Sequence, residues 1–385
     1  MTLQFIRTLA APLTSLMLLM MASGLFNTFS SLRLEMEGFA PEAIGVAISA
    51  LYAGIFIGSL WIQRLIQALG LVRSLIAFAL GSSILILAQS LWIQLWYWVA
   101  LRLLGGMCMA GIFIAIESWF LLQGTSKTRG TILSIYLGAF YTALTLGQLL
   151  IAPFNPMGQA CFYIAAALSA ASIAPLLFKK LSEPRLSTSI RLSSVQLFRL
   201  SPLGFTGGVV SGMVLAAIYG LVPVFAFAIG YSASDIGNLM AAIIFGGVSL
   251  QWPLGYLADR GDRRAVLNKV SFFSALTACA LTLSANIPFS LFLALAWLFG
   301  GFSFTLYPLS MAYTCEQVEE NQVVAATGGF VLSYSIGAIA GPLIAPLFMQ
   351  LCGNAGLFYF LAAISLFLGL CGLKKPLAAQ SPEDE

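Results

Sequence analysis

Residues 255–264 read Gly-Tyr-Leu-Ala-Asp-Arg-Gly-Asp-Arg-Arg and bring five charged side chains together within ten residues. This cluster falls between two apolar runs, 236–257 and 266–285. Glycine lets a helix end approach its neighbour, and an acid beside several bases can form ion pairs that break when helices move. The stretch therefore predicts a turn between two helices that acts as a latch. The alternative is a plain loop whose basic residues only fix orientation.

The composition of the whole chain excludes a water-soluble globule. Of its 385 residues 60% are hydrophobic and 8% are charged, and the mean hydropathy is +0.96. Soluble domains carry about 25% charged residues. The charged clusters alternate with apolar runs of roughly 20 residues, the length that crosses a bilayer as a helix.

A window of about 19 residues predicts twelve membrane spans, which makes the chain an all-α membrane protein. The first span follows Arg7 but is longer than the apolar core of a signal peptide, so we expect it to be retained. The predicted spans are 9–31, 43–62, 74–91, 94–121, 131–153, 159–178, 203–228, 236–257, 266–285, 289–313, 325–349 and 355–373.

Basic residues fix the predicted orientation. If the amino terminus is cytoplasmic, every Lys and Arg except Arg33 and Arg102 falls on the cytoplasmic side. Arg33 would face outward and Arg102 lies within a span. The longest polar interruption, 179–202, then divides the chain into six spans plus six. We expect an amino-terminal bundle (1–178), a cytoplasmic linker (179–202) and a carboxy-terminal bundle (203–385), with both termini cytoplasmic.

The 255–264 stretch resembles the signature of the major facilitator superfamily, G-x-x-x-D-R/K-x-G-R/K-R/K, with Asp262 at the usual second glycine. The matching loop of the first half, 63–73, keeps Gly70 and Arg73 but has Gln67 in place of the acid. The resemblance implies two six-helix pseudo-repeats and a gating role for these loops and one helix end. The residues concerned are Gln67, Gly70, Arg73, Gly255, Asp259, Arg260, Arg263, Arg264 and Glu316.

Longer strings resemble the YcaD-type branch of that superfamily. They are 117–130, 211–223, 251–255, 304–308 with Cys315-Glu316, and 332–334 with Gly341-Pro342. The resemblance implies transport across the bacterial inner membrane and names no cargo.

Two charges lie within predicted spans, where charge is costly and therefore marks function. Arg102 resembles the family's fourth-helix arginine, linked to proton or substrate coupling; the alternative is snorkelling or hydrogen bonding to carbonyls. Glu117 is our candidate for proton coupling, and the alternative is a gate carboxylate paired with Arg129 or Arg73. Arg102 and Glu117 cannot pair, because fifteen helical residues separate them by about 22 Å.

Polar side chains at helical spacing indicate which faces meet a cavity. Ser23, Asn27 and Ser30 share one face, as do Tyr141, Thr145 and Gln148, and in lipid such a face must point at protein or water. Ser303, Tyr307, Ser310 and Thr314 make a third. The resemblance to the family adds four residues to the predicted cavity by their positions: Tyr219, Gln251, Trp252 and Tyr334. Each of them taken alone could equally well be a polar contact between helices. The predicted cavity residues are Asn27, Arg102, Tyr141, Gln148, Tyr219, Gln251, Trp252, Tyr307 and Tyr334.

Absences narrow the function. The chain has no His, which excludes imidazole metal sites and Ser/His or Cys/His nucleophiles, and it has no P-loop. We expect no enzyme activity, no cofactor, no metal site and no nucleic-acid partner, and we expect a monomer whose partners are the bilayer, a small molecule and protons.

The sequence thus predicts a secondary active transporter of the bacterial inner membrane that moves a small organic solute by alternating access, with proton coupling. Two alternatives stay open. Arg102 with the outer Arg33 fits an importer of an anionic metabolite or metal chelate such as a siderophore. A lateral groove lined by Leu and Phe would fit a lipid flippase on the same fold.

Overall fold

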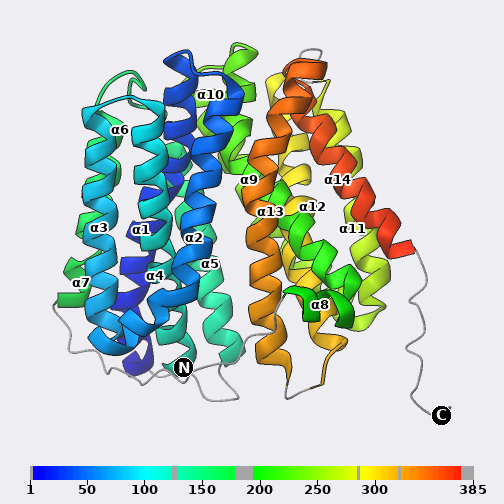
Figure 1. Cartoon of the computed structure of the whole chain (residues 1–385), viewed down its shortest axis with the longest axis horizontal. Helices are drawn as coiled ribbons and strands as arrows, with labels where there is room; N and C mark the ends of the chain where they lie inside the picture. Colours follow the sequence, from blue (N-terminus) through cyan, green and yellow to red (C-terminus); the bar gives the residue numbers. More distant parts are fainter. Residues whose placement is uncertain (1–2, 124–128, 178–193, 284–286, 320–321, 374–385) are drawn as a thin grey trace.

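The computed structural model describes residues 3–123, 129–177, 194–283, 287–319 and 322–373. In these residues the protein is a bundle of twelve long helices and two short ones (Figure 1). They are α1 (Leu3–Met36), α2 (Pro41–Leu69), α3 (Leu71–Leu91), α4 (Leu95–Gln123), α5 (Arg129–Leu149), α6 (Ala160–Ala171), α7 (Ala174–Leu177), α8 (Ser194–Leu200), α9 (Pro202–Ala228), α10 (Ala233–Arg260), α11 (Arg263–Leu281), α12 (Phe289–Glu316), α13 (Val323–Cys352) and α14 (Gly356–Leu373).

The predicted all-α fold class is confirmed. Of the helices in the described ranges, ten are long and apolar enough to cross a membrane, with α6 and α7 forming one span, Ala160–Leu177. The two long helices left out, α5 and α11, carry polar residues on the cavity face and basic residues in the first turns, respectively. The predicted linker lies partly outside the described residues, and its end forms α8.

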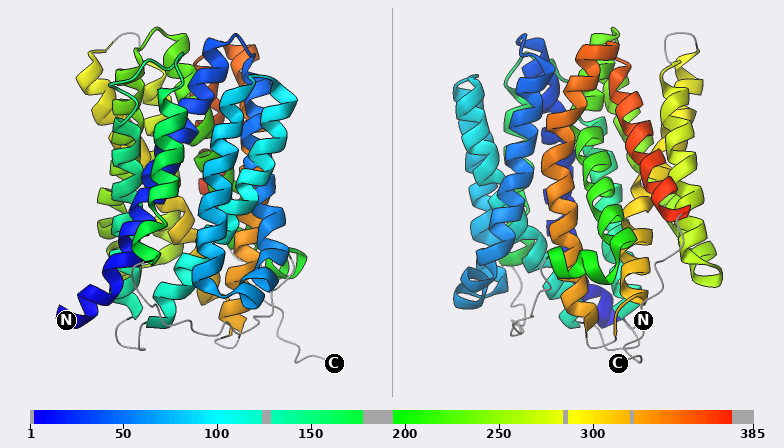
Figure 2. Two further views of the ribbon diagram at one scale, coloured as in Figure 1. Left: turned by 90° about the vertical axis from the view of Figure 1, so that its left-hand side faces the viewer. Right: turned by 45° about the vertical axis from the view of Figure 1, so that its right-hand side comes forward.

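The helix ends follow their local sequence. Ser232 and Asp235 form a capping box at the start of α10, and the Asp262 side chain accepts from the backbone N–H of Arg264 at the start of α11. Gly70 takes φ of 89° between α2 and α3, a conformation that favours glycine. We call the end with the α10–α11 turn the inner end and the end with the α1–α2 turn the outer end. α14 runs toward the end where α1 begins (Figures 1 and 2).

Reciprocal glycine contacts bring the helices together. A Cβ on Gly54 of α2 would overlap the carbonyl oxygen of Leu103, and one on Gly106 of α4 would overlap that of Leu51. Each glycine thus faces the carbonyl three residues before its partner glycine. Small residues allow this close backbone approach in membranes.

The same arrangement recurs at three further helix pairs in the described ranges. Gly246 and Gly300 face each other in this way between α10 and α12, as do Gly24 and Gly147 between α1 and α5, and Gly212 and Gly337 between α9 and α13. The second and fourth helices of each six therefore share one contact, and the first and fifth share another. This is an internal structural repeat.

The two sets of six meet mainly through α2 with α13 and through α5 with α10, and α9 also contacts α1 and α2. Near the outer end, the Ser49 hydroxyl donates to the carbonyl oxygen of Ile339 at 2.8 Å, and Gly45 packs against Pro342. On the other contact, Gly237 of α10 lies against the carbonyl of Gln148. These contacts seal the outer end.

The glycine contacts generate a matched test. Gly106→Ala should lower the unfolding free energy by about 1–3 kcal/mol, because the added methyl group overlaps backbone of α2. Its neighbour Gly105 has no atom within 4 Å of an added Cβ, so Gly105→Ala should be neutral or stabilise by up to about 1 kcal/mol through helix propensity. Thermal unfolding in detergent measures both. Equal melting temperatures for the two variants would contradict the packing described.

Candidate functional site

Arg102 lies in a small chamber near the outer end. The chamber has a volume of about 10 Å³, and α1, α2, α4 and α9 line it with Asn27, Ser31, Ile48, Leu51, Tyr52, Arg102, Tyr219 and Gly220. The Arg102 side chain donates from Nη1 to Asn27 Oδ1 at 3.0 Å, and its Cζ lies 4.9 Å from the centre of the Phe26 ring. Arg102 is only 5% exposed. The guanidinium is therefore held by an amide and a ring face.

No carboxylate balances this charge within the described ranges. The ion pairs found there join Arg33 to Glu37 and Arg263 to Asp259 and Glu316. A buried ion without a counter-ion costs several kcal/mol. The chamber is thus suited to a ligand group that accepts hydrogen bonds.

Five tyrosines form a cluster beside the chamber. Tyr52, Tyr141, Tyr219, Tyr307 and Tyr334 come from α2, α5, α9, α12 and α13, and Tyr334 lies within electrostatic range of the other four. The rings of Tyr307 and Tyr334 stand edge to face with centroids 5.1 Å apart. Four of these tyrosines were expected at the cavity. Tyr52 was missed, although a phenol in the middle of an apolar span, three residues after Ser49, was a signal in the sequence.

A larger cavity of about 370 Å³ opens between α5 and α10 in the inner half of the bundle. We call it the α5–α10 cavity. It is lined by Ser134, Leu137, Gly138, Tyr141, Val248, Gln251, Trp252, Gly255, Tyr256 and Asp259. Three predicted cavity residues, Tyr141, Gln251 and Trp252, line it together with two predicted gating residues.

Phe304 contacts one lining residue of each of the two spaces. Phe304 of α12 contacts Tyr141 of the α5–α10 cavity at a centroid distance of 6.0 Å and Tyr219 of the small chamber at 5.7 Å. Phe304 is buried, and a Cβ on Gly247 would touch its ring. The wall between the chamber and the inner cavity is therefore aromatic and thin.

Glu117 of α4 has an exposed side chain. It lies within electrostatic range of Tyr136 and Tyr307. It makes no ion pair with Arg73 in the described structure, and the side chain of Arg129 lies outside the described part. Glu117 therefore lies near the tyrosine cluster, toward the end of α4 away from Arg102.

Gln148 lies apart from the other predicted cavity residues. Its side chain is 0% exposed, it lines neither of the two cavities, and both amide atoms lack a hydrogen-bond partner among the described residues. Its backbone carbonyl faces Gly237 in the outer seal. In this conformation the Gln148 amide is enclosed in the closed part of the α5–α10 contact.

The predicted latch residues of the second half form a connected cluster at the inner end. Arg263 donates from Nη2 to Asp259 Oδ1 at 2.8 Å, and its Nη1 lies 2.7 Å from Glu316 Oε1. Arg264 donates to the carbonyl oxygen of Gly372 at 2.8 Å. The described partners all belong to α10, α11, α12 and α14, so the cluster braces the second half in this conformation.

The remaining gating candidates have different surroundings. Arg260 places its Cζ 4.3 Å from the centre of the Tyr256 ring, and Gly255 has no atom within 4 Å of an added Cβ. In the first half Gln67 and Arg73 are exposed. Gln67 carries no charge, and Arg73 has no ion-pair partner in the described structure. Gly70 makes the turn between α2 and α3. The first-half loop thus lacks the ionic brace of its counterpart.

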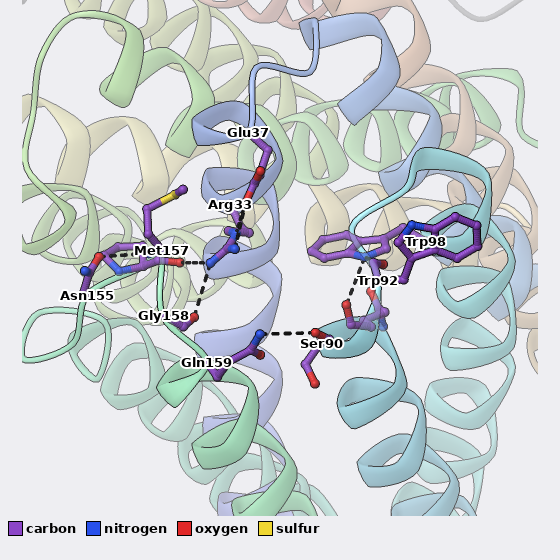
Figure 3. Close-up of polar contacts among 11 residues, drawn as sticks. Arg33, Glu37, Ser90, Trp92, Trp98, Asn155, Met157, Gly158 and Gln159 are labelled. Carbon is purple, nitrogen blue, oxygen red and sulfur yellow. Dashed lines mark hydrogen bonds and ion pairs between the residues drawn. The ribbon is translucent and has the colours of Figure 1, made fainter.

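Arg33 is tied into the outer loops (Figure 3). Its Nε donates to Glu37 Oε1 at 2.9 Å, and its Nη1 donates to the carbonyl oxygens of Pro156 at 2.9 Å and Gly158 at 3.3 Å. Nearby, Gln159 donates to the carbonyl oxygen of Ser90 at 3.3 Å. Because its donors are engaged and it is buried, Arg33 is a structural residue and gives no support to an outer anion site.

Comparison with known proteins assigns the fold to a family. The model of the Major Facilitator Superfamily matches residues 13–248 and 204–384. The chain belongs to this superfamily. It is accordingly a multi-pass membrane protein and a secondary transporter, and not an enzyme.

Relatives of this superfamily transporter match over nearly its full length. The uncharacterized MFS-type transporter YcaD of Escherichia fergusonii is 34% identical over 374 residues, which cover 96% of each chain. YcaD of Escherichia coli O9:H4 is 34% identical over 361 residues, 92% of each chain. The predicted resemblance to the YcaD-type branch is confirmed.

Solved structures of the superfamily share the fold. The nucleoside transporter NupG has a TM-score of 0.77 at 15% identity, covering 95% of this chain and 98% of its own. A D-xylose–proton symporter has a TM-score of 0.76 at 13% identity, covering 97% and 98%. At these identities the likeness concerns the fold alone.

The Arg102 contacts of this superfamily member can be tested by stability. Asn27→Ala removes the described hydrogen-bond acceptor of the buried guanidinium and should cost about 1.5–3 kcal/mol of unfolding free energy. Ser31→Ala, in the same chamber and on the same helix, should cost less, because its hydroxyl donates to the Asn27 backbone carbonyl and not to Arg102. Denaturant unfolding measures the unfolding free energy of both variants. An equal loss of unfolding free energy in the two would show that the Arg102–Asn27 hydrogen bond does not contribute to stability.

Proposed function

We propose that this protein moves a small organic solute across the bacterial inner membrane by alternating access, as a monomer with both termini cytoplasmic. The observation that carries the proposal is the asymmetry of the bundle: the outer end is sealed by α2–α13 and α5–α10 contacts, while the α5–α10 cavity lies in the inner half. A carrier that exposes one site to each side in turn has this form in its inward-facing state.

The solute site in this proposal is the tyrosine cluster together with the small chamber. The site brings an Arg102 cation, phenol hydroxyls and aromatic faces from both halves to one place. Such a lining suits a partly apolar molecule that accepts hydrogen bonds, since rings supply area and the few polar groups fix orientation. Rocking of the halves would open the outer contacts and close the inner cavity.

Glu117 is the proposed proton carrier. Its side chain is exposed, makes no described ion pair and borders the tyrosine cluster through Tyr307. A carboxylate within a span that is free of a fixed partner can change its charge between the two states of the carrier, and an intramembrane acid is a functional candidate by default.

An anionic cargo is the second candidate, and one observation favours it: Arg102 has no described carboxylate partner. Arg33 gives no support to an anionic cargo, because its donors are engaged by Glu37 and by backbone carbonyl oxygens. The flippase alternative has less support, because the lining of the α5–α10 cavity is polar and aromatic and contains one Leu and no Phe. If Arg102→Ala abolishes the counterflow of anionic solutes and leaves that of neutral solutes unchanged, the cargo is an anion.

Proton coupling is tested with Glu117→Gln in proteoliposomes. A thermal-shift screen of metabolites, drugs and siderophores first supplies a solute that stabilises the protein. Glu117→Gln should then keep counterflow exchange of that solute and lose its accumulation driven by a pH gradient, because the amide cannot carry a proton. Glu42→Gln, in the first turn of α2 at the outer end, is the control. Unchanged pH-driven accumulation in Glu117→Gln would rule out this role.

A further inference from the structure

The α5–α10 cavity is lined by two helices only. All ten lining residues belong to α5 or α10, and none comes from the helices around Arg102. These two helices form one of the contacts between the halves. The cavity is therefore a slot in the joint between the halves, and it does not belong to the central chamber.

The depth of the slot places it beside acyl chains. Trp252 precedes Arg260, at the inner end of α10, by eight residues, which is about 12 Å along a helix. Half of the hydrocarbon core of a bilayer is about 15 Å thick. With Arg260 taken as the edge of the hydrocarbon core, Trp252 would lie at the level of the inner leaflet's chains, below the headgroups where tryptophan is usually found.

One wall of the slot is a stack of flat groups. The rings of Trp252 and Tyr256 are 6.0 Å apart and nearly parallel at 22°, and the Arg260 guanidinium caps the far face of this pair over Tyr256. Trp252 is 78% exposed and has no other ring contact among the described residues. The stack therefore ends in an indole of the slot lining that is covered by no further ring in the described structure.

The slot is wide and has polar groups along it. An added Cβ on Gly138 of α5 or on Gly255 of α10 would have no atom within 4 Å. Gln251, Tyr141 and Asp259 bring an amide, a phenol and a carboxylate to the lining. Flat rings prefer offset stacking on such a face, and polar groups in an otherwise apolar slot orient a ligand.

The slot also leads toward the chamber. Tyr141 lines the slot, Tyr219 lines the chamber, and Phe304 touches both. Three contacting rings, those of Tyr141, Phe304 and Tyr219, therefore connect the slot to the Arg102 chamber.

We propose that the α5–α10 slot is a lateral binding site that takes an amphipathic solute with a flat aromatic ring from the inner leaflet. The ring stacks on Trp252 and the polar part lies along Gln251 and Tyr141. This inference deepens the proposed function and rests on it, since it names the chemical class of the solute and the side from which it enters.

The first experiment measures lipid access to Trp252 without transport. The protein is placed in bilayers of phosphatidylcholine with brominated acyl chains, which quench indole fluorescence on contact, and is compared with Trp252→Phe. The part of the fluorescence that the brominated chains quench should be smaller in Trp252→Phe. This variant lacks the one indole that we expect the chains to contact in the slot. If the brominated chains quench both proteins equally, or if only aqueous acrylamide reaches Trp252, the slot is closed to lipid and the proposal is overturned.

The second experiment measures binding with a matched pair of probes, naphthyl glucoside and cyclohexyl glucoside. They share a polar head and differ in the flatness of the apolar part. Naphthyl glucoside should bind more tightly to the protein in nanodiscs, and Trp252→Ala should weaken its binding by about tenfold, while Trp252→Phe keeps most of it. Equal binding of both probes, or equal binding by Trp252→Ala, would overturn the proposal.

A variant that fills the slot provides the structural control. Gly138→Leu should abolish naphthyl glucoside binding, whereas Gly105→Leu, on α4 with equal space around its Cβ and outside the slot lining, should not. If both variants lose naphthyl glucoside binding, or if neither does, the proposed site is contradicted.

If the probe binds and lipid quenches Trp252 but no solute exchanges across the membrane, the proposed function fails while the slot stands. If solutes exchange across the membrane but the wild-type protein binds no naphthyl glucoside, the slot fails while the function stands.

Discussion

The fold depends on how closely its helix backbones approach one another. In the described part of the chain, eight glycines form four reciprocal contacts, and in each a glycine faces the carbonyl three residues before its partner. In a bilayer the hydrophobic effect does not drive helices together, so packing at short range must do so. The contacts recur at equivalent positions in the two sets of six helices. They hold the helices of each set of six close together.

The contents of the joint explain how the two ends differ. Near the outer end it is closed by a glycine against Pro342 and by the Ser49 hydrogen bond, whereas at the inner end the facing residues of α5 and α10 stand apart around Trp252. Between these levels lie the buried Arg102 cation and the tyrosines. Because Arg102 takes its described contacts from Asn27 and Phe26, both on α1, the charge is held within the first half.

Hydropathy and the charged loop were sufficient to predict the all-α fold, the superfamily and most spans, since both depend on composition over long windows. The rotation of each helix was harder to predict. Tyr141 and Gln148 share a helical face, yet one lines a cavity and the other is enclosed by Gly237, because the face passes from an open to a closed part of the joint. Tyr52 was missed since a single phenol produces no periodic pattern. The hydrogen bonds of Arg33 could not be predicted, because its carbonyl partners, Pro156 and Gly158, are distant in sequence.

The enclosed amide of Gln148 affects the resting balance of the carrier. When the outer end closes, this side chain is dehydrated and gains no described hydrogen bond in return, a cost of about 1–3 kcal/mol. In the proposed alternating access, water would restore those bonds when the outer end opens. The penalty would then offset part of the free energy that keeps the outer end of the empty carrier closed.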